Sequence, residues 1–469
     1  MPPALHLRPE RFFPSDPATR AVAMRLFSSV EKSPIISPHG HTDPAWFAKN
    51  EPFEDAVSLL IWPDHYLLRM LYSQGVSLSA LGLGQGPETQ RDRRAIWQLF
   101  AQNYPLFRAT PSRIWLDHIF STIFGLDVRL TEATADHYFD TINDALAKPE
   151  FRPRALFERF GIETLATTEG ALDELHHHRA IADSGWKGRV ITTFRPDAVL
   201  DPEHPDFRKN VEELGALTYK DVAKWKGYLT AIACRRAFFK EHGATATDHG
   251  HRTAQTANLS AVAAQTLLDR ALKGSISAEE AELFRAQMLT EMARMSCDDK
   301  LVMQLHPGVW RNHKPLLLER YGRDKGADLP MRTDFVSALK PLLDVFGNNP
   351  DFTLILFTLD ETTYSRELAP LAGHYPCLKL GPAWWFHDSP EGMMRFRRQT
   401  TETAGFYNTV GFNDDTRAFL SIPARHDLAR RIDCSYLAEL VVTHRLEEDE
   451  AHEIAQQLAY DIVKKAYRL

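Results

Sequence analysis

Short apolar runs recur along the chain with helical stretches between them. Besides a first run within residues 34–44, they span residues 162–168, 189–195, 244–249, 301–306, 353–358, 377–381 and 410–415. Runs of this length are typical of buried strands. Eight strands separated by helices favour parallel pairing, because parallel neighbours need long crossovers. The pattern therefore predicts an α/β fold, a distorted (β/α)8 barrel.

Residues 50–160 interrupt this alternation. No convincing strand pattern appears there. In segments such as 95–100 and 112–116, apolar and polar residues alternate between two faces with the period of a helix. We therefore expect a helical insertion between the first two strands. We expect four parts of the chain. Residues 1–49 hold an N-terminal helix and the first strand, and residues 50–160 hold the insertion. Residues 161–446 form the remainder of the barrel, and residues 447–469 form a C-terminal helix.

Apolar spacing predicts both of these terminal helices. The first starts at Asp16-Pro17 and continues toward Glu31. The second carries its apolar residues on one face, which is typical of an amphipathic helix. Those residues are Ile454, Leu458 and Ile462.

The composition excludes several classes of protein. A chain of 469 residues exceeds what one ordinary core supports, which fits a large domain with an insertion. The net charge of −7 argues against a nucleic-acid groove binder. The four cysteines show no Cys-x-x-Cys spacing, which suits a reducing cytoplasm. We find neither the apolar core of a signal peptide nor an apolar run that would span a bilayer. We expect a soluble, cytosolic protein without nucleic-acid or membrane partners.

The first predicted strand ends in His39-Gly40-His41. The glycine lets the backbone fold tightly enough for both imidazoles to face one point, as in a metal site. With twenty histidines in the chain, the pair could also serve as polar groups of a loop. Imidazoles with a carboxylate suit a divalent metal such as zinc or manganese.

A barrel gathers function at the carboxyl ends of its strands, where this chain places its polar residues. Asp415 ends the last predicted strand, so closure of the barrel would bring it beside His39 and His41. Its alternative role is to cap the helix that follows. His306 could complete the metal shell or contact the substrate, or it could be a loop residue whose ring is simply hydrogen-bonded. A functional role is less strongly indicated for His249, because its histidine-rich loop could be solvated.

Three further groups could take part in chemistry. His65 and Tyr66 begin a predicted helix and offer proton-transfer groups, although a surface helix face would show the same periodicity. Arg195 offers a guanidinium for a carboxylate, and Trp385 belongs to an aromatic run that could form a wall. Both could instead form an ion pair or pack in the core.

Taken together, these residues resemble the uronate isomerase (glucuronate isomerase) family of the amidohydrolase superfamily. The resemblance runs over nearly the whole chain, and its motifs keep their order and spacing. They are Ser37-Pro38-His39-Gly40-His41, Asp64-His65-Tyr66, Thr167-Thr168-Glu169, Phe194-Arg195-Pro196-Asp197, Met303-Gln304-Leu305-His306 and Asp414-Asp415-Thr416-Arg417.

The resemblance implies a distorted (β/α)8 barrel with an added helical region and one divalent metal, usually zinc. It implies reversible conversion of D-glucuronate to D-fructuronate and of D-galacturonate to D-tagaturonate, the first step of bacterial hexuronate breakdown, and we expect a homo-oligomer. By position, His39, His41, Asp415 and, less directly, His306 resemble metal ligands. Arg417, His65 and Tyr66 resemble partners of the sugar, and Arg195 with Trp385 resembles a binding site for its carboxylate end.

Two departures from the family pattern matter. Many members have Thr-Asp-Ser-Arg at the last strand, so Asp414 competes with Asp415 as a ligand, although the spacing to Arg417 favours Asp415. No lysine closes the fourth strand, as it does in hydrolytic relatives with two metals. We therefore expect one metal.

Isomerisation needs a base over one face of an open-chain sugar, an acid at the neighbouring oxygen and stabilisation of an enediolate-like charge. Asp415 could serve as the base, Tyr66 or His65 as the acid, and the metal with Arg417 as the electrophile. Two alternatives remain open. One is a metal-dependent hydrolase of a lactone or amide on the same scaffold, and the other is a non-catalytic sugar-acid binding protein.

Overall fold

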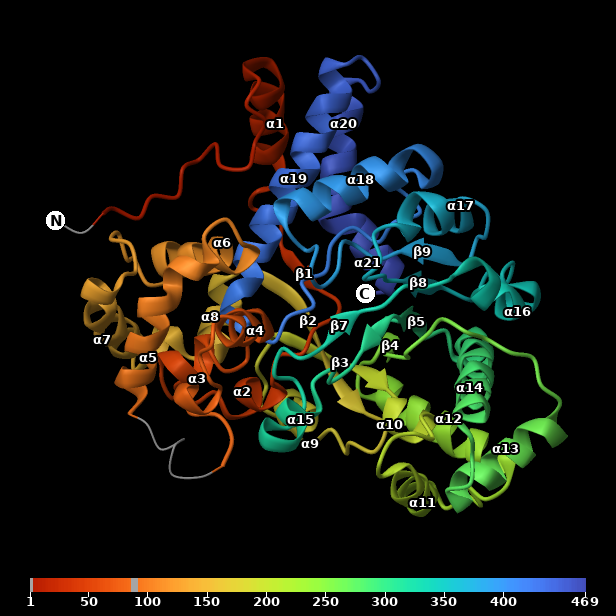
Figure 1. Ribbon diagram of the computed structural model, residues 1–469. Coiled ribbons are helices and arrows are strands. Elements are labelled where there is room, and N and C mark those ends of the chain that lie inside the picture. The colour runs from red at the N-terminus through yellow and green to blue at the C-terminus, as the bar shows by residue number, and fades with distance from the viewer. Residues whose placement is uncertain (1–2, 86–91) are drawn as a thin grey trace.

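The computed structural model describes residues 3–85 and 92–469, and its centre is a curled sheet of seven parallel strands (Figure 1). The first two residues and residues 86–91 of the predicted insertion lie outside the described residues. In sheet order the strands are β1 (Ile35–Ser37), β2 (Ile162–Gly170), β3 (Arg189–Arg195), β4 (Ala246–His249), β5 (Val302–Leu305), β8 (Leu354–Leu356) and β9 (Leu378–Leu380). Each overlaps a predicted strand.

The prediction of an eighth strand at residues 410–415 is wrong. This segment forms no strand, and among the described residues the only pairing beside it is a single parallel bridge of the preceding Thr409 with Leu380. The reason lies in its backbone, because Gly411 and Asp415 have φ angles of 71° and 37°, far from the extended region of a strand. The segment still closes the sheet, since the amide of Val410 donates to the Leu380 carbonyl at 3.0 Å and the amide of His41 donates to the Thr416 carbonyl at 3.0 Å.

Helices surround the sheet, and those between β1 and β2 form a separate layer at the left of Figure 1. Among the described residues of this region no named strand occurs. Its helices are α2 (Pro44–Lys49), α3 (Ala56–Leu60), α4 (His65–Ser73), α5 (Arg93–Asn103), α6 (Pro111–His118), α7 (Ala135–Leu146) and α8 (Pro153–Arg159). The predicted distorted (β/α)8 barrel with a helical insertion is confirmed.

The remaining helices follow the later strands. They are α9 (His176–Asp183), α10 (Asp197–Leu200), α11 (Phe207–Thr218), α12 (Trp225–Glu241), α13 (Ala261–Lys273), α14 (Ala278–Asp299), α15 (Pro315–Tyr321), α16 (Val336–Phe346), α17 (Ala369–Ala372), α18 (Pro390–Ala404) and α19 (Ile422–Val442). Among the described residues, no helix is long and apolar enough to cross a membrane.

The two terminal helices pack near each other on α19 (Figure 1). Helix α1 (Pro17–Val30) starts where predicted, because the side chain of Asp16 accepts from the Thr19 amide at 2.8 Å. The C-terminal segment forms α20 (Glu448–Gln456), a π turn and α21 (Ile462–Tyr467). Its predicted apolar residues are all buried in the same cluster: Ile454, Leu458 and Ile462.

The apolar interior has several centres. The helices of the insertion enclose one of them and join the sheet through Ile35, Ile162 and Leu165. Another fills the space between the strands, where Val463 and Tyr467 of α21 pack with buried strand residues. Those strand residues are Ile36, Ala246, Val302 and Ile355. The last helix thus supports the strands from which the polar residues project.

A short antiparallel hairpin, β6 (Val309–Trp310) with β7 (Leu329–Pro330), has no counterpart among the predicted strands. Each of its strands has two residues, which is too short for an alternating pattern to be recognised. The hairpin follows β5 and carries α15 between its strands. It brings charged residues to the same end of the sheet as the predicted site.

A buried polar network links β2 and β3 to α9. Glu169 of β2 accepts a hydrogen bond from the hydroxyl of Thr192, and His178 of α9 lies 3.7 Å from the same carboxylate. The hydroxyl of Thr167 lies 2.9 Å from the His178 ring. Burial raises the pKa of Glu169 from 4.5 to about 7.

This network predicts a pH-dependent stability. Because the folded-state pKa is raised, the contribution of Glu169 is fully present below about pH 4.5 and is lost as the pH rises through about 7. Between about pH 5 and pH 8, the free energy of unfolding of Glu169→Gln relative to wild type should shift by about 2 to 3 kcal/mol in favour of the variant. Urea unfolding across this pH range measures the shift, and the exposed Glu150→Gln is the control. A difference that does not vary with pH would contradict the assignment.

Candidate active site and metal centre

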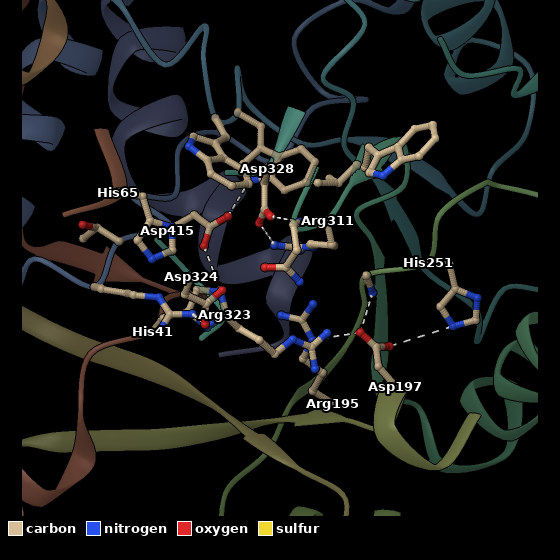
Figure 2. A pocket seen from close by; sticks show the side chains of 18 of the residues that line it. His41, His65, Arg195, Asp197, His251, Arg311, Arg323, Asp324, Asp328 and Asp415 are labelled. Carbon is tan, nitrogen blue, oxygen red and sulfur yellow. Dashed lines mark hydrogen bonds and ion pairs between the residues drawn. The ribbon is translucent and has the colours of Figure 1, made fainter. Parts of the chain in front are cut away.

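A cavity of about 550 Å³ opens at the carboxyl ends of the parallel strands (Figure 2). Its wall combines strand ends with the start of α4 and with the connection around β6 and β7. Seven of the residues singled out in the sequence line it: His41, His65, Tyr66, Arg195, Trp385, Asp415 and Arg417. His39 and His306 are buried beside these residues rather than exposed to the cavity. The structure thus brings the predicted site residues together.

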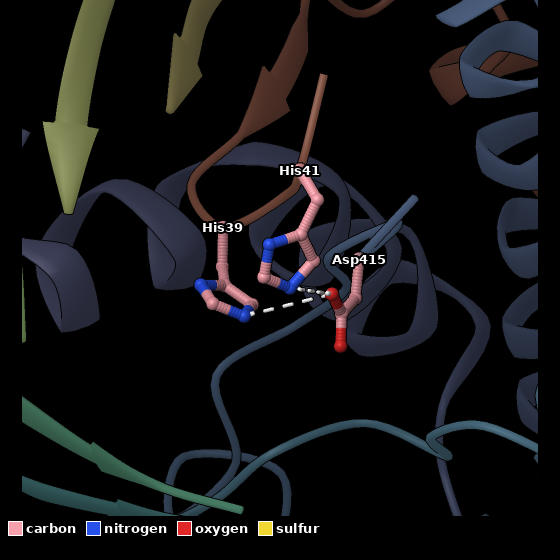
Figure 3. Close-up of side chains that lie close together, drawn as sticks. All are labelled: His39, His41 and Asp415. Atoms are coloured by element: carbon pink, nitrogen blue, oxygen red, sulfur yellow. Dashed lines mark ion pairs between the residues drawn. The ribbon is translucent and has the colours of Figure 1, made fainter. Parts of the chain in front are cut away.

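His39, His41 and Asp415 form the tightest group (Figure 3). The Nε2 atoms of His39 and His41 lie 3.5 and 3.3 Å from Oδ1 of Asp415. Four ligands about 2.0–2.1 Å from a zinc ion would be about 3.4 Å apart at the corners of a tetrahedron. The three side chains therefore fit one divalent metal.

Hydrogen bonds outside this group orient its members. The indole N–H of Trp384 donates to Oδ2 of Asp415 at 2.6 Å, which leaves Oδ1 toward the histidines. Nδ1 of His39 lies 3.4 Å from the amide nitrogen of Gln304, and the hydroxyl of Tyr467 donates to the Gln304 oxygen at 3.1 Å. The bond from Trp384 fixes the orientation of the Asp415 carboxylate, and the contact with Gln304 restricts the rotation of the His39 ring.

The protonation states also suit a metal. Burial lowers the pKa of His39 to about 4, so its imidazole is neutral at pH 7 and keeps a lone pair for coordination. Burial alone would raise the pKa of Asp415, but the imidazoles of His39 and His41 outweigh it and hold the pKa below its usual range. Asp415 is therefore a carboxylate at neutral pH.

Glycine at position 40 is less necessary than the sequence suggested. A Cβ there would lie 3.5 Å from the carbonyl oxygens of Ala166 and Thr416, which is ordinary van der Waals contact. The residue also has no positive φ angle. The histidines converge because β1 ends there and the closing segment lies beside it.

Asp414 does not belong to the group of His39 and His41. Its carboxylate lies 3.1 Å from Nε2 of His426 on α19. The two candidates are thus separated by geometry, since Asp415 alone faces both His39 and His41.

His306 belongs to a second group with His39 and Asp248. Its Nδ1 lies 2.7 Å from Oδ1 of Asp248, and its ring stacks on that of His39 with centroids 4.9 Å apart. Nε2 of His306 is buried without a hydrogen-bond partner among the described residues. The geometry therefore leaves His306 close to the metal group but does not expose it to the cavity.

Arg195 links two carboxylates at the ends of β3 and β4. Its Nη1 lies 3.1 Å from Asp248, and its Nε lies 2.9 Å from Asp197. Burial would raise the pKa of Asp248, yet the guanidinium of Arg195 and the ring of His306 hold it well below its usual range. Arg195 is therefore held by ion pairs and still reaches the cavity.

His65 and Tyr66 start α4, where the side chain of Asp64 caps the helix. The alternative of a surface helix face is wrong, because both residues line the cavity. Burial and the nearby Arg417 lower the pKa of His65 to about 3, so its ring is neutral. The hydroxyl of Tyr66 donates to Asp388 at 2.5 Å and accepts from the Phe386 amide at 2.8 Å.

Trp385 and Arg417 complete the cavity wall. The ring of Trp385 lies 6.0 Å from that of His65, centroid to centroid. Arg417 forms an ion pair of 3.0 Å with Asp324, and its side chain is 40% exposed. A guanidinium this open can exchange its partner for a bound anion.

The sequence did not point to the charged residues of the β6–β7 connection. Arg311, Arg323, Asp324 and Asp328 face the cavity in Figure 2. These residues lie between two strands that are too short to be predicted. The only sign of them in the sequence is a cluster of charged residues in this stretch. The buried Asp388 and Arg425 were missed as well, and their ion pair of 2.8 Å holds Tyr66 in place.

The suggestion that the loop after β4 is solvated is wrong. His249 and His251 are both buried, with 0% and 6% of their surface exposed. They form a third group with Asp197 at the other end of the cavity. Burial lowers the pKa of His249 to about 3.

Comparisons with known proteins agree with one another. Over residues 14–467 the chain matches the sequence profile of the glucuronate isomerase family. A uronate isomerase of Xanthomonas oryzae pv. oryzae (strain MAFF 311018) is 64% identical over 467 residues, which cover 99% of each chain.

Solved structures lead to the same family. The crystal structure of glucuronate isomerase from Caulobacter crescentus is 61% identical with a TM-score of 0.98, and the match covers 99% of this chain and 97% of that one. The uronate isomerase from Thermotoga maritima is 26% identical with a TM-score of 0.92, and the match covers 98% and 99%.

The ligand geometry generates a prediction about metal content. The double variant His39→Ala, His41→Ala should lose the tightly bound divalent ion, because a single carboxylate cannot hold it against dialysis. Metal analysis of the purified proteins by mass spectrometry measures the loss. His176→Ala removes an exposed imidazole on α9 and should keep the ion. Equal metal content in the double variant and wild type would place the ion elsewhere.

Proposed function

Since the chain belongs to the glucuronate isomerase family, we propose that it converts D-glucuronate to D-fructuronate and D-galacturonate to D-tagaturonate. The observation that carries this proposal is a cavity lined by His41 and Asp415 of the His₂Asp group and by the guanidiniums of Arg195 and Arg417. Such a cavity offers positive charge for the carboxylate of a uronate and metal ligands for its hydroxyl end. The comparisons favour this isomerase over a hydrolase and over a non-catalytic binding protein.

We assign His39, His41 and Asp415 as the ligands of one divalent metal, zinc or manganese. When bound, it would supply a Lewis acid for the sugar oxygens at C1 and C2. His306 is the candidate for a fourth ligand, because its ring stacks on that of His39 and its Nε2 has no hydrogen-bond partner among the described residues.

Proton transfer between C2 and C1 needs a base that takes the hydrogen from C2 and returns it to C1. We propose Asp415, whose carboxylate reaches both the histidine pair and the cavity. The enediolate-like charge that forms meanwhile would be stabilised by the guanidinium of Arg417.

His65 is a better candidate than Tyr66 for the acid at the neighbouring oxygen. The hydroxyl of Tyr66 is committed to Asp388 and Phe386, and burial raises its pKa well above 10. His65 is neutral and lines the cavity, so its ring N–H can donate to a sugar oxygen. Tyr66 would then hold the turn at Phe386, which positions Trp385.

The carboxylate end of the sugar is assigned to Arg195 and Trp385. Nε and Nη1 of Arg195 form the ion pairs with Asp197 and Asp248, and Nη2 takes part in neither of them. A planar guanidinium suits a carboxylate, and an indole face covers the apolar side of a sugar ring or chain. We also propose a cytoplasmic location, in keeping with four free cysteines.

Ketose formation is the direct test. The purified protein with its metal, incubated with D-glucuronate or D-galacturonate, should produce the corresponding ketose, detected by a colorimetric ketose assay. Turnover in deuterated water should place deuterium in the product, because an enediol exchanges its proton with solvent. Absence of ketose from both sugars would refute the function, and ketose without label would replace proton transfer by a hydride shift.

Arg417 allows a test of the electrophile. Arg417→Lys should lower kcat about 10²-fold, because one preorganised donor to a developing oxyanion contributes about that much. Thermal unfolding should change little, since the guanidinium is partly exposed and has one ion pair. Asp324→Asn keeps the guanidinium and removes only its partner, so its kcat should fall much less. A similar loss in both variants would assign the effect to the ion pair.

A further inference from the structure

The chain contains a second His-Gly-His sequence, His249-Gly250-His251, at the carboxyl end of β4. Its two rings are perpendicular like those of the first pair, with an interplanar angle of 77° in both and centroids 6.0 and 5.3 Å apart. Both pairs follow parallel strands of the same sheet. The two ends of the cavity are thus built from the same local arrangement.

A carboxylate accompanies the second pair as well. Asp197 begins α10, directly after β3, and its Oδ1 lies 3.9 Å from Nε2 of His251. One ligand atom from each of Asp197, His249 and His251 lies within 4.8 Å of the others. Figure 2 shows Asp197 between Arg195 and His251 at the end of the cavity away from Asp415.

The other oxygen of Asp197 is already used. Its Oδ2 accepts from the Nε of Arg195 at 2.9 Å and from the amide of Gly250 at 3.0 Å. A Cβ at Gly250 would overlap the Arg195 guanidinium, so glycine is required for this close approach. These two contacts aim Oδ1 toward the histidines.

Several buried polar atoms of this group have no partner among the described residues. They are Oδ1 of Asp197, Nδ1 of His249, and both ring nitrogens of His251. Leaving a buried polar atom without a partner costs about 1–3 kcal/mol, so a cluster of four indicates a ligand that satisfies them. Neutral imidazoles and a carboxylate together are typical ligands of zinc.

His249 is oriented as a ligand. Its Nε2 lies 3.0 Å from the hydroxyl of Thr247, and a ring that donates from Nε2 carries its lone pair on Nδ1. Nδ1 is the atom of His249 without a partner, and His249 lies in one group with Asp197 and His251. Fixing the far nitrogen in this way is how proteins orient metal-ligating histidines.

The surrounding charge also favours a cation. Arg285 is bound by Asp201, Glu203 and Glu282 at 2.7 Å each. Arg195 is shared by Asp197 and Asp248. Carboxylates therefore outnumber guanidiniums around His251, and a divalent ion would offset the excess negative charge.

We propose that Asp197, His249 and His251 form a second divalent-metal site, distinct from the group of His39, His41 and Asp415, which takes zinc or a similar borderline ion. Its remaining coordination position opens into the cavity, because Asp197 and His251 line it. This differs from the single metal expected from the sequence. The wider spacing of its ligands means weaker binding than at the first site, because the side chains must move together by several tenths of an ångström.

Metal binding tests the site independently of catalysis. Metal-free wild type titrated with zinc against a chromophoric chelator should show two classes of site, the second at least tenfold weaker. His251→Ala should lose only the weaker class, whereas His39→Ala, His41→Ala should lose only the tighter one. His176→Ala, an exposed histidine, should keep both. One class in wild type, or an unchanged weaker class in His251→Ala, would overturn the proposal.

Crystals of the wild-type protein in millimolar zinc provide a second measurement that needs no variant. Anomalous difference density at the zinc edge should appear between Asp197, His249 and His251 as well as at the first group. Density for an ordered water without anomalous signal between these three residues would overturn the proposal. Neither result depends on ketose formation, so failure of the second site and failure of the proposed isomerase activity remain distinguishable.

Discussion

The break in the closing segment of the barrel is the constraint on which the site depends. A regular eighth strand would continue the sheet past Asp415, but the positive φ angle of this residue turns its carboxylate toward His39 and His41. A non-glycine residue in this conformation costs about 1–3 kcal/mol. Hydrogen bonds from Trp384 to its carboxylate and from His41 to the Thr416 carbonyl hold it in place. The backbone strain at Asp415 and the convergence of the three side chains are therefore two aspects of one feature.

Buried charge extends from this point across the strand ends. A hydrogen bond from His306 to Asp248 and the ion pairs of Arg195 with Asp248 and Asp197 form a continuous polar chain between the two histidine pairs. Removing one member would leave its neighbour charged and unpaired in the interior, which is far more costly than losing an exposed ion pair. The two ends of the cavity are therefore electrostatically connected, and a change at one end alters the charge felt at the other.

Much of the fold and site could be predicted because barrel strands are short apolar runs that end in polar residues. The bounds of β3 and the convergence of His41, Arg195 and Asp415 follow from that pattern. The irregular residues 410–415 could not be predicted, since a positive φ angle leaves no mark on an aspartate in the sequence. The hairpin was missed because its strands have two residues each. His249 was misassigned because a histidine-rich loop has the same composition whether solvent or protein surrounds it.

The position of the last helix has a consequence for how the protein is made. Tyr467 of α21 packs among the strands and donates to Gln304, whose amide faces His39. Residues from opposite ends of the chain thus meet beneath the first metal group. Contacts of such long range form late, after loop-closure entropy has been overcome. During synthesis on the ribosome, a chain that has not yet emerged as far as α21 has its histidine pair but lacks the support beneath it, so we expect the group of His39, His41 and Asp415 to be completed late.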